Sequence, residues 1–202
     1  MNRPVIVIGA GGHAKVLIDA IKLSAIRIIG VTDLLDTKLE GVKYLGTDQG
    51  IFNYKPDQIL LVNGVGSVGV SAKRKNLFDQ FKEKGYSFAN VIHPSAVIGS
   101  RVELGEGVQI MAGAIIQTGA VIGRNTIINT RASVDHDAQI GDHVHIAPGA
   151  VLCGGVSVEE GAFIGAGATI TQGTKIQKET LVKAGSLVTA KSEIGIYERT
   201  NH

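Results

Sequence analysis

The chain has 202 residues, a net charge of +2, one cysteine and no tryptophan. The small charge gives no indication of a nucleic-acid partner, and a single cysteine excludes an intramolecular disulfide. The sequence shows neither a signal-peptide pattern nor an apolar run long enough for a membrane span, so we predict a cytoplasmic protein without membrane insertion.

The first segment combines an apolar run, a glycine-rich turn and a helical pattern. Residues 4–8 are continuously apolar, which predicts a strand buried on both faces. Gly9-Ala10-Gly11-Gly12-His13-Ala14 follows and leads into a helix. This order predicts a phosphate cradle, because glycines let a phosphate approach the backbone and a helix N-terminus supplies amide donors.

The remaining pattern up to residue 90 predicts two more strands and a second helix. The strands cover 27–31, ending near Asp33, and 58–62, leading into Asn63-Gly64. The helix covers about 71–84, and a short strand at 86–91 follows it. We predict an α/β domain at residues 1–90, a half-Rossmann fold with a parallel sheet.

Two alternatives remain open for the glycine-rich turn. It fits the pattern G-x-G-x-x-[GA], and Asp33 lies about 20 residues further on, as in dinucleotide-binding dehydrogenases. However, a full dinucleotide needs two halves of the doubly wound fold, whereas a nucleoside diphosphate joined to a sugar fits one half. The turn could also bind no ligand.

A repeat of six residues dominates the chain from residue 92 to residue 188. Its first position is always Ile, Leu or Val, the residue two before is small or β-branched, and the residue three after is often Gly. The aliphatic positions are Ile92, Ile98, Leu104, Ile110, Ile116, Ile122, Ile128, Val134, Ile140, Ile146, Leu152, Val158, Ile164, Ile170, Ile176, Val182 and Val188.

This period matches a solenoid of short strands and sharp corners. Three hexads would close a triangular coil of about 18 residues, and we predict a parallel β-helix over residues 91–202. A β-sandwich, the alternative fold, has strands at a spacing of about 8–12 residues. The residues just before the core aliphatics point outward, and we expect an exposed subunit interface of Val97, Ile115, Val121, Ile127, Val151, Phe163, Leu181 and Leu187.

Polar residues gather in the middle of the repeat, at Asn129, Arg131, 135–137 and 142–145. His136 follows Val134 by two positions and therefore lies at a corner. Its neighbours one coil away, Thr118 and Gly154, are small, so we expect an exposed and reachable imidazole. His145 directly precedes Ile146 and should point outward from an edge.

These motifs resemble a known family of enzymes. Ile122-Gly123-Arg124-Asn125-Thr126-Ile127 and similar hexads resemble the hexapeptide-repeat acyltransferases. Together with Gly11-Gly12-His13-Ala14, Val134-Asp135-His136-Asp137 and His145-Ile146-Ala147-Pro148-Gly149, they resemble the nucleotide-sugar and sialic acid acetyltransferases, which include the bacillosamine-pathway N-acetyltransferases. The resemblance implies a left-handed β-helix, a homotrimer, acetyl-CoA as co-substrate and no metal.

The resemblance also implies roles for particular residues. His136 would be the general base that takes a proton from the attacking sugar amine, with Asp137 orienting and tuning the imidazole. The family commonly has Glu beside this histidine, and this chain has Thr32 where an acidic residue can precede Asp33. The acetyl-CoA contacts would be His145, Ala166 and Ala184, and the nucleotide-sugar contacts would be Gly11, Gly12, His13, Asp33 and Gly64.

Other functions fit parts of the pattern. A metal site could use His136, Asp142, His143 and His145, although corners of a rigid prism point apart. Cys153 could form an acyl-enzyme, but no base stands beside it in the sequence. The acceptor could be a hydroxyl of a sialic acid-like sugar, and a hexapeptide-repeat protein could also serve as a non-catalytic scaffold.

Overall fold

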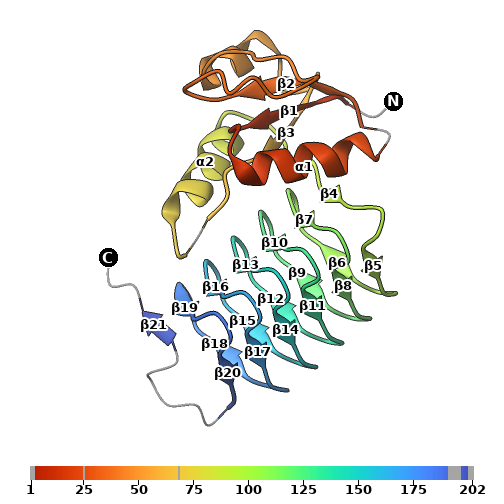
Figure 1. Cartoon of the computed structure of the whole chain (residues 1–202), viewed down its shortest axis with the longest axis vertical. Coiled ribbons are helices and arrows are strands. Elements are labelled where there is room, and N and C mark those ends of the chain that lie inside the picture. Colours follow the sequence, from red (N-terminus) through yellow and green to blue (C-terminus); the bar gives the residue numbers. More distant parts are fainter. Residues whose placement is uncertain (1–2, 25, 68, 191–196, 200–202) are drawn as a thin grey trace.

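The computed structural model describes residues 3–24, 26–67, 69–190 and 197–199, and an α/β unit precedes a triangular solenoid (Figure 1). Three parallel strands form the sheet of the α/β unit in the order β2-β1-β3. The elements of this unit are β1 (Val5–Ile8), α1 (Gly12–Lys22), β2 (Ile28–Thr32), the 3-10 helix η1 (Asp48–Asn53), β3 (Leu60–Asn63) and α2 (Ala72–Glu83).

Both faces of this sheet are covered, as the continuous apolar run predicts. Val5 and Val7 pack with α1, whereas Ile6 and Ile8 pack with Phe78 of α2 on the other face. The strand expected at 86–91 is reduced to an isolated bridge between Leu61 and Phe88. Among the described residues, no helix combines the length and apolarity needed to cross a bilayer.

The solenoid has three flat faces. Face 1 contains β4 (Val91–Ile92), β7 (Gln109–Ile110), β10 (Ile127–Ile128), β13 (His145–Ile146), β16 (Phe163–Ile164) and β19 (Thr180–Val182), and β21 (Tyr197–Arg199) adds to it antiparallel. Face 2 contains β5 (Val97–Ile98), β8 (Ile115–Ile116), β11 (Ser133–Val134), β14 (Val151–Leu152), β17 (Thr169–Ile170) and β20 (Leu187–Val188). Face 3 contains β6 (Glu103–Leu104), β9 (Val121–Ile122), β12 (Gln139–Ile140), β15 (Ser157–Val158) and β18 (Lys175–Ile176).

The hexad pattern accounts for this architecture. From Ile98 onward, the repeated aliphatics pack into one core along the prism together with most of the small residues two before them, as predicted. Ile92 is an exception: it is 38% exposed, while Val91 beside it packs into the cluster of α1, so the predicted burial of Ile92 is wrong. Equivalent residues of successive coils pair in parallel, for example Ile110 with Ile128 and Ile128 with Ile146. At the corners the third residue has positive φ, which glycine adopts at low cost, and Asn125 and Asp137 adopt the same conformation. The predicted α/β half-Rossmann unit and β-helix are both confirmed.

The α/β unit sits on face 1 of the solenoid (Figure 1). Met111 of the solenoid joins the apolar cluster of α1, and His145 on face 1 contacts Ser67. The corner between faces 2 and 3, called corner 2–3 below, is therefore on the side of the prism opposite the α/β unit.

Candidate functional site

The glycine-rich turn borders a cavity of about 560 Å³, the cradle cavity. The first-turn amides of α1 lie at its edge, and no side chain caps them, because the N-cap residue is Gly11. All five residues predicted to hold a nucleotide sugar line it. Its lining is Ile8, Gly9, Gly11, Gly12, His13, Asp33, Leu34, Thr47, Asp48, Gln49, Gly64, Val65, Gly66, Lys73 and Leu77.

Asp33 and Gly64 shape this cavity. Asp33 Oδ2 accepts the amide of Ala10 at 2.6 Å, and Oδ1 accepts the amide of Leu34 at 2.6 Å, so the carboxylate holds the glycine-rich turn against the end of β2. A Cβ at Gly64 would lie 2.7 Å from the carbonyl oxygen of Ile8 and 2.9 Å from Cβ of Ala14. Glycine is required here because β1 and α1 approach so closely.

A second cavity, the bridging cavity, shares Gly12, His13 and Gly66 with the cradle cavity and continues to Asn129 and His145 on the solenoid. His145 points outward from face 1, as predicted, but the α/β unit covers it and its exposure is 8%. Its Nδ1 lies 2.9 Å from Ser67 Oγ, and its Nε2 lies 3.1 Å from Asn129 Nδ2. Burial lowers the pKa of His145 to about 3.

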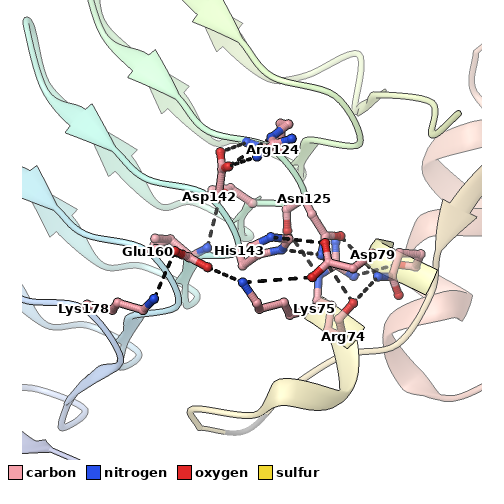
Figure 2. A network of polar contacts seen from close by, with 12 residues as sticks. Arg74, Lys75, Asp79, Arg124, Asn125, Asp142, His143, Glu160 and Lys178 are labelled. Atoms are coloured by element: carbon pink, nitrogen blue, oxygen red, sulfur yellow. Dashed lines mark hydrogen bonds and ion pairs between the residues drawn. The ribbon is translucent and has the colours of Figure 1, made fainter. Parts of the chain in front are cut away.

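A polar network joins α2 to the solenoid at the corner between faces 3 and 1 (Figure 2). Arg74 is buried, and its Nη1 donates to the carbonyls of Asn63 at 2.7 Å and Val65 at 2.9 Å, while Nε donates to the carbonyl of Asn125 at 3.3 Å. Burial lowers the pKa of Arg74 to about 9. Arg74 thereby fixes the loop that forms one wall of the cradle cavity.

The structure separates the polar residues that are close together in the sequence. His143 Nδ1 lies 2.9 Å from Asn125 Nδ2, and Asp142 pairs with Arg124 at 2.7 Å, so both residues belong to the network in Figure 2. His145 lies on face 1, and His136 lies at corner 2–3, so the histidines of the hypothetical metal site point in different directions. Within the described part of the chain, no cluster of His, Cys, Asp and Glu could hold a metal ion.

Two histidines make the junction between the units sensitive to acid. Burial lowers the pKa of His13 to about 4, so His13 and His145 stay neutral in the folded chain while an unfolded chain titrates near 6.5. Their contribution to stability is fully present above pH 6.5 and declines as the pH falls toward 4. Each histidine lowers the free energy of unfolding by up to about 1.4 kcal/mol per pH unit in this window. We expect the midpoint of urea unfolding to decrease as the pH is lowered from 7 to 4.5, and to decrease less steeply in His145→Asn than in the wild type. Equal pH dependence of the midpoint in the two proteins would contradict this.

His136 lies at corner 2–3 with its side chain 51% exposed. Its Nδ1 lies 2.9 Å from Asp137 Oδ2, so the shorter acidic residue does reach the imidazole. Asp137 has a φ of 58°. The hydrogen bond to Asp137 raises the pKa of His136 above its ordinary value, and it leaves Nε2 available as a proton acceptor.

Gly154 gives the imidazole its room. A Cβ at this glycine would stand 2.5 Å from Nε2 of His136, so the ring rests directly against the glycine one coil away, as predicted. Cys153 precedes Gly154 at the same corner and is partly exposed. The His136 ring therefore rests against the residue that follows Cys153, although no histidine stands near Cys153 in the sequence.

Ala166 and Ala184 stack at the corner between faces 1 and 2, where the amide of Gly185 donates to the carbonyl of Ala166 at 2.9 Å. Both alanines are exposed. Asn129 occupies the same corner two coils earlier. Ala166 and Ala184 thus lie along this edge of the prism, and His145 on the adjoining face 1 lines the bridging cavity.

The expected exposed patch divides between the faces. Ile127 is fully buried beneath the α/β unit, so its predicted exposure is wrong, and Phe163 and Leu181 on the same face are only partly exposed. Among the described residues of the solenoid, face 2 carries most of the large exposed apolar side chains, with exposures of 60% for Val97, 39% for Ile115, 40% for Val151 and 58% for Leu187, and Ser133 and Thr169 interrupt this apolar row. The outward residues of face 3 are mostly polar: Glu103, Val121, Gln139, Ser157 and Lys175.

Gln109 is a residue of this region that sequence reasoning missed. It is buried on face 1, with one hydrogen bond to His13 and another to Asn63. A detectable signal was present, because Gln109 occupies an outward hexad position that is apolar in the adjacent coils of the same face, at Val91 and Ile127.

Comparisons with known proteins agree with this geometry. Residues 4–81 match the PglD N-terminal domain, and residues 101–136, 119–154 and 137–172 match the bacterial transferase hexapeptide repeat. The comparison with curated proteins gave no match.

Solved structures align over most of the chain. The acetyltransferase domain of PglB from Neisseria gonorrhoeae is 31% identical, with 96% of this chain and 95% of that chain covered and a TM-score of 0.85. The same domain in complex with acetyl coenzyme A aligns at 30% identity, with 94% of each chain covered and a TM-score of 0.83. PerB from Caulobacter crescentus, in complex with CoA and GDP-perosamine, is 38% identical, with 93% and 89% covered and a TM-score of 0.85.

Proposed function

Because the chain belongs to the family of hexapeptide-repeat acetyltransferases that carry a PglD N-terminal domain, we propose that it transfers an acetyl group from acetyl-CoA to the amino group of a nucleotide-linked amino sugar. The observation that carries this proposal is the continuity of the two cavities. The cradle cavity begins at the amides of α1, and the bridging cavity continues from it to His145 and Asn129 on the solenoid.

The cavities suit the two ends of such a substrate. The uncapped amides after Gly11 suit a diphosphate, and the bridging cavity gives the attached sugar a route toward face 1. Acetyl-CoA running along Ala184 and Ala166 would bring its thioester toward Asn129 and His145. The relatives bound to acetyl coenzyme A, and to CoA with GDP-perosamine, support these two ligand classes.

His136 suits the role of general base. Its Nδ1–H donates to Asp137, so Nε2 accepts the proton that the sugar amine loses as its nitrogen attacks the thioester carbonyl. The new C–N bond forms, the C–S bond breaks, and CoA leaves as the thiol after it regains a proton. The raised pKa makes this histidine a stronger base than an ordinary one.

A second copy of the chain is needed to assemble this site. His136 stands across the prism from the cradle cavity, and the lining of that cavity does not include it. Face 2 offers an uncovered apolar row beside corner 2–3, whereas the α/β unit covers face 1 and face 3 is mostly polar. We therefore propose a cyclic homotrimer in which face 2 packs against neighbours and His136 serves an adjoining subunit.

An acetyltransferase assay with a panel of UDP- and GDP-linked amino sugars tests this function. We expect CoA release and an N-acetylated product with at least one member of the panel. Matched nucleotide sugars that carry a hydroxyl in place of the amine are the control. Turnover of the hydroxyl compounds alone would show O-acetylation. If no CoA is released with either series, the proposal is contradicted.

Enlarging Gly12 is expected to block the cradle cavity without disturbing the fold. No atom lies within 4 Å of the position that a Cβ would occupy. Gly12→Val should therefore raise the KM for the nucleotide sugar by about 10- to 100-fold, the cost of losing charge-assisted contacts to a phosphate. Gly12→Ala should have a smaller effect, and the KM for acetyl-CoA should be unchanged. An equal rise in both KM values would argue against this assignment.

A further inference from the structure

Gln109 is a solenoid side chain that contacts His13 in the lining of the cradle cavity and Asn63, which directly precedes Gly64 of that lining. Its Nε2 donates to the carbonyl of Asn63 at 2.8 Å, at the end of β3, and its Oε1 lies 2.7 Å from His13 Nε2, at the start of α1. Gln109 is 1% exposed, so neither contact competes with water.

These contacts fix the orientation of the amide and the position of the imidazole proton. A carbonyl oxygen can only accept, so the NH₂ group of Gln109 must face Asn63, and its oxygen must face His13. His13 must then carry its proton on Nε2. Because the ring is neutral, with its pKa lowered to about 4 chiefly by burial, Nδ1 bears a lone pair and no proton.

The lone pair on Nδ1 is available to a ligand. His13 lines both cavities, and within the described residues no hydrogen bond to its Nδ1 is found. Among the described residues, the buried side-chain polar atoms without a hydrogen-bond partner are Arg74 Nη2 and Thr180 Oγ1. Because Nδ1 of His13 is not one of them, it is not enclosed by protein atoms. His13 packs against Gly66, where an added Cβ would stand 2.9 Å from Cβ and 3.5 Å from Cγ of His13.

We infer that Gln109 is a positioning residue that locks His13 as a hydrogen-bond acceptor, so that Nδ1 binds a hydroxyl of the nucleotide sugar and the side chain does not donate to its phosphates. This inference rests on the proposed function of the cavities. Phosphate recognition is then left to the backbone amides after Gly11. An N–H or O–H donor at this point of the substrate is recognised, and an analogue that lacks it is bound less well.

Two substitutions separate the two nitrogens. His13→Gln retains a donor near the position of Nε2 and keeps the contact with Gln109, but it removes the acceptor at the position of Nδ1. His13→Asn retains an oxygen near the position of Nδ1 and loses the contact with Gln109. We expect His13→Gln to weaken binding of the nucleotide amino sugar by about five- to tenfold, the value of one hydrogen bond, and His13→Asn to weaken it less.

Calorimetry with GDP- and UDP-linked amino sugars, with GDP and UDP, and with inorganic pyrophosphate locates the donor. If His13→Gln binds the nucleoside diphosphates more weakly as well, the donor is a ribose hydroxyl. If only the sugar-bearing compounds bind more weakly, the donor is a sugar hydroxyl. Both results support the inference, provided that pyrophosphate binding is unchanged. Weaker pyrophosphate binding, or wild-type binding of every compound by His13→Gln, would overturn it.

The tautomer is measurable in the unmutated protein and without any substrate. Long-range ¹H–¹⁵N spectra should show His13 protonated at Nε2 alone at pH 7 and still at pH 5, with the signal assigned by its loss in His13→Gln. A proton on Nδ1, or an imidazolium at pH 7, would refute the locking role of Gln109. The Nε2 tautomer together with no binding of any nucleotide would instead refute the proposed function and, with it, the ligand contact.

Discussion

Replacing His136 with alanine is expected to lower kcat by about 10²- to 10⁴-fold, the usual contribution of a positioned proton acceptor. Both substrates should still bind, because the imidazole removes a proton and contributes little affinity in the ground state. The wild-type value of kcat/KM should fall on acidification, since a protonated imidazole accepts no proton. The raised pKa makes this fall begin at a higher pH than for an ordinary histidine.

The control for this prediction is Asp137→Ala, which removes the partner at 2.9 Å and leaves the base in place. It should cause a smaller loss of kcat and move the acidic limb of the profile to lower pH, because the hydrogen bond that raises the pKa is gone. Cys153→Ala tests the acyl-enzyme alternative at the same corner. Direct transfer would be rejected by three results together: Cys153→Ala has no activity, a burst of free CoA precedes steady turnover, and His136→Ala turns over at a near-normal rate.

A charge on face 2 is expected to cause a comparable loss without touching the chemistry. Val151→Asp adds a carboxylate to the apolar row, and burying it against a neighbouring subunit is strongly unfavourable. We expect light scattering to detect monomers, with activity reduced at least about 10²-fold because in the proposed trimer the base comes from another chain. Gln139→Asp, at the equivalent exposed position on face 3, is the matched control and should remain trimeric and active.

Mixed assemblies provide a direct test of sharing between subunits. His136→Ala chains keep an intact cradle cavity, and Gly12→Val chains keep an intact base. Assayed at a nucleotide-sugar concentration well below the raised KM of Gly12→Val, co-refolded mixtures of the two impaired variants should recover part of the activity, since some sites then combine one intact cavity with one intact base. Absence of recovery in verified mixed trimers, or a fully active monomer of Val151→Asp, would show that each chain holds a complete site.

The hexad pattern determines whether a side chain points into the prism, points out of it or lies at a corner. For this reason the core, the corners and the surroundings of His136 could be predicted. Ile127 and Val151 share one hexad position, yet one is fully buried and the other is 40% exposed. A period of six does not distinguish the three faces, so it could not reveal which face the α/β unit covers. Reading every eighteenth residue would have separated the apolar row of face 2 from the polar row of face 3.

The contacts across the junction were beyond sequence reasoning for a different reason. Arg74 and Gln109 both donate to the backbone carbonyl of Asn63 at the end of β3, and Arg74 also donates to the backbone carbonyl of Asn125. Backbone partners of this kind have no side-chain signature. His145 illustrates the same limit. Its direction follows from the pleat, but its burial and its low pKa depend on an element that precedes it by more than sixty residues.

The stacking of the coils also means that distances along the solenoid are whole multiples of one strand spacing. Gln109 and His145 lie on the same face two coils apart, since Gln109 pairs with Ile127 and Ile127 pairs with His145. Neighbouring parallel strands are about 4.8 Å apart, so each added coil increases the distance along a face by about this amount. Lengthening or shortening the solenoid by one coil between these residues would change the distance from the cradle cavity to the proposed position of the acetyl group by one strand spacing, with every corner preserved. In such a scaffold the distance between residues of one face can therefore change only in discrete steps.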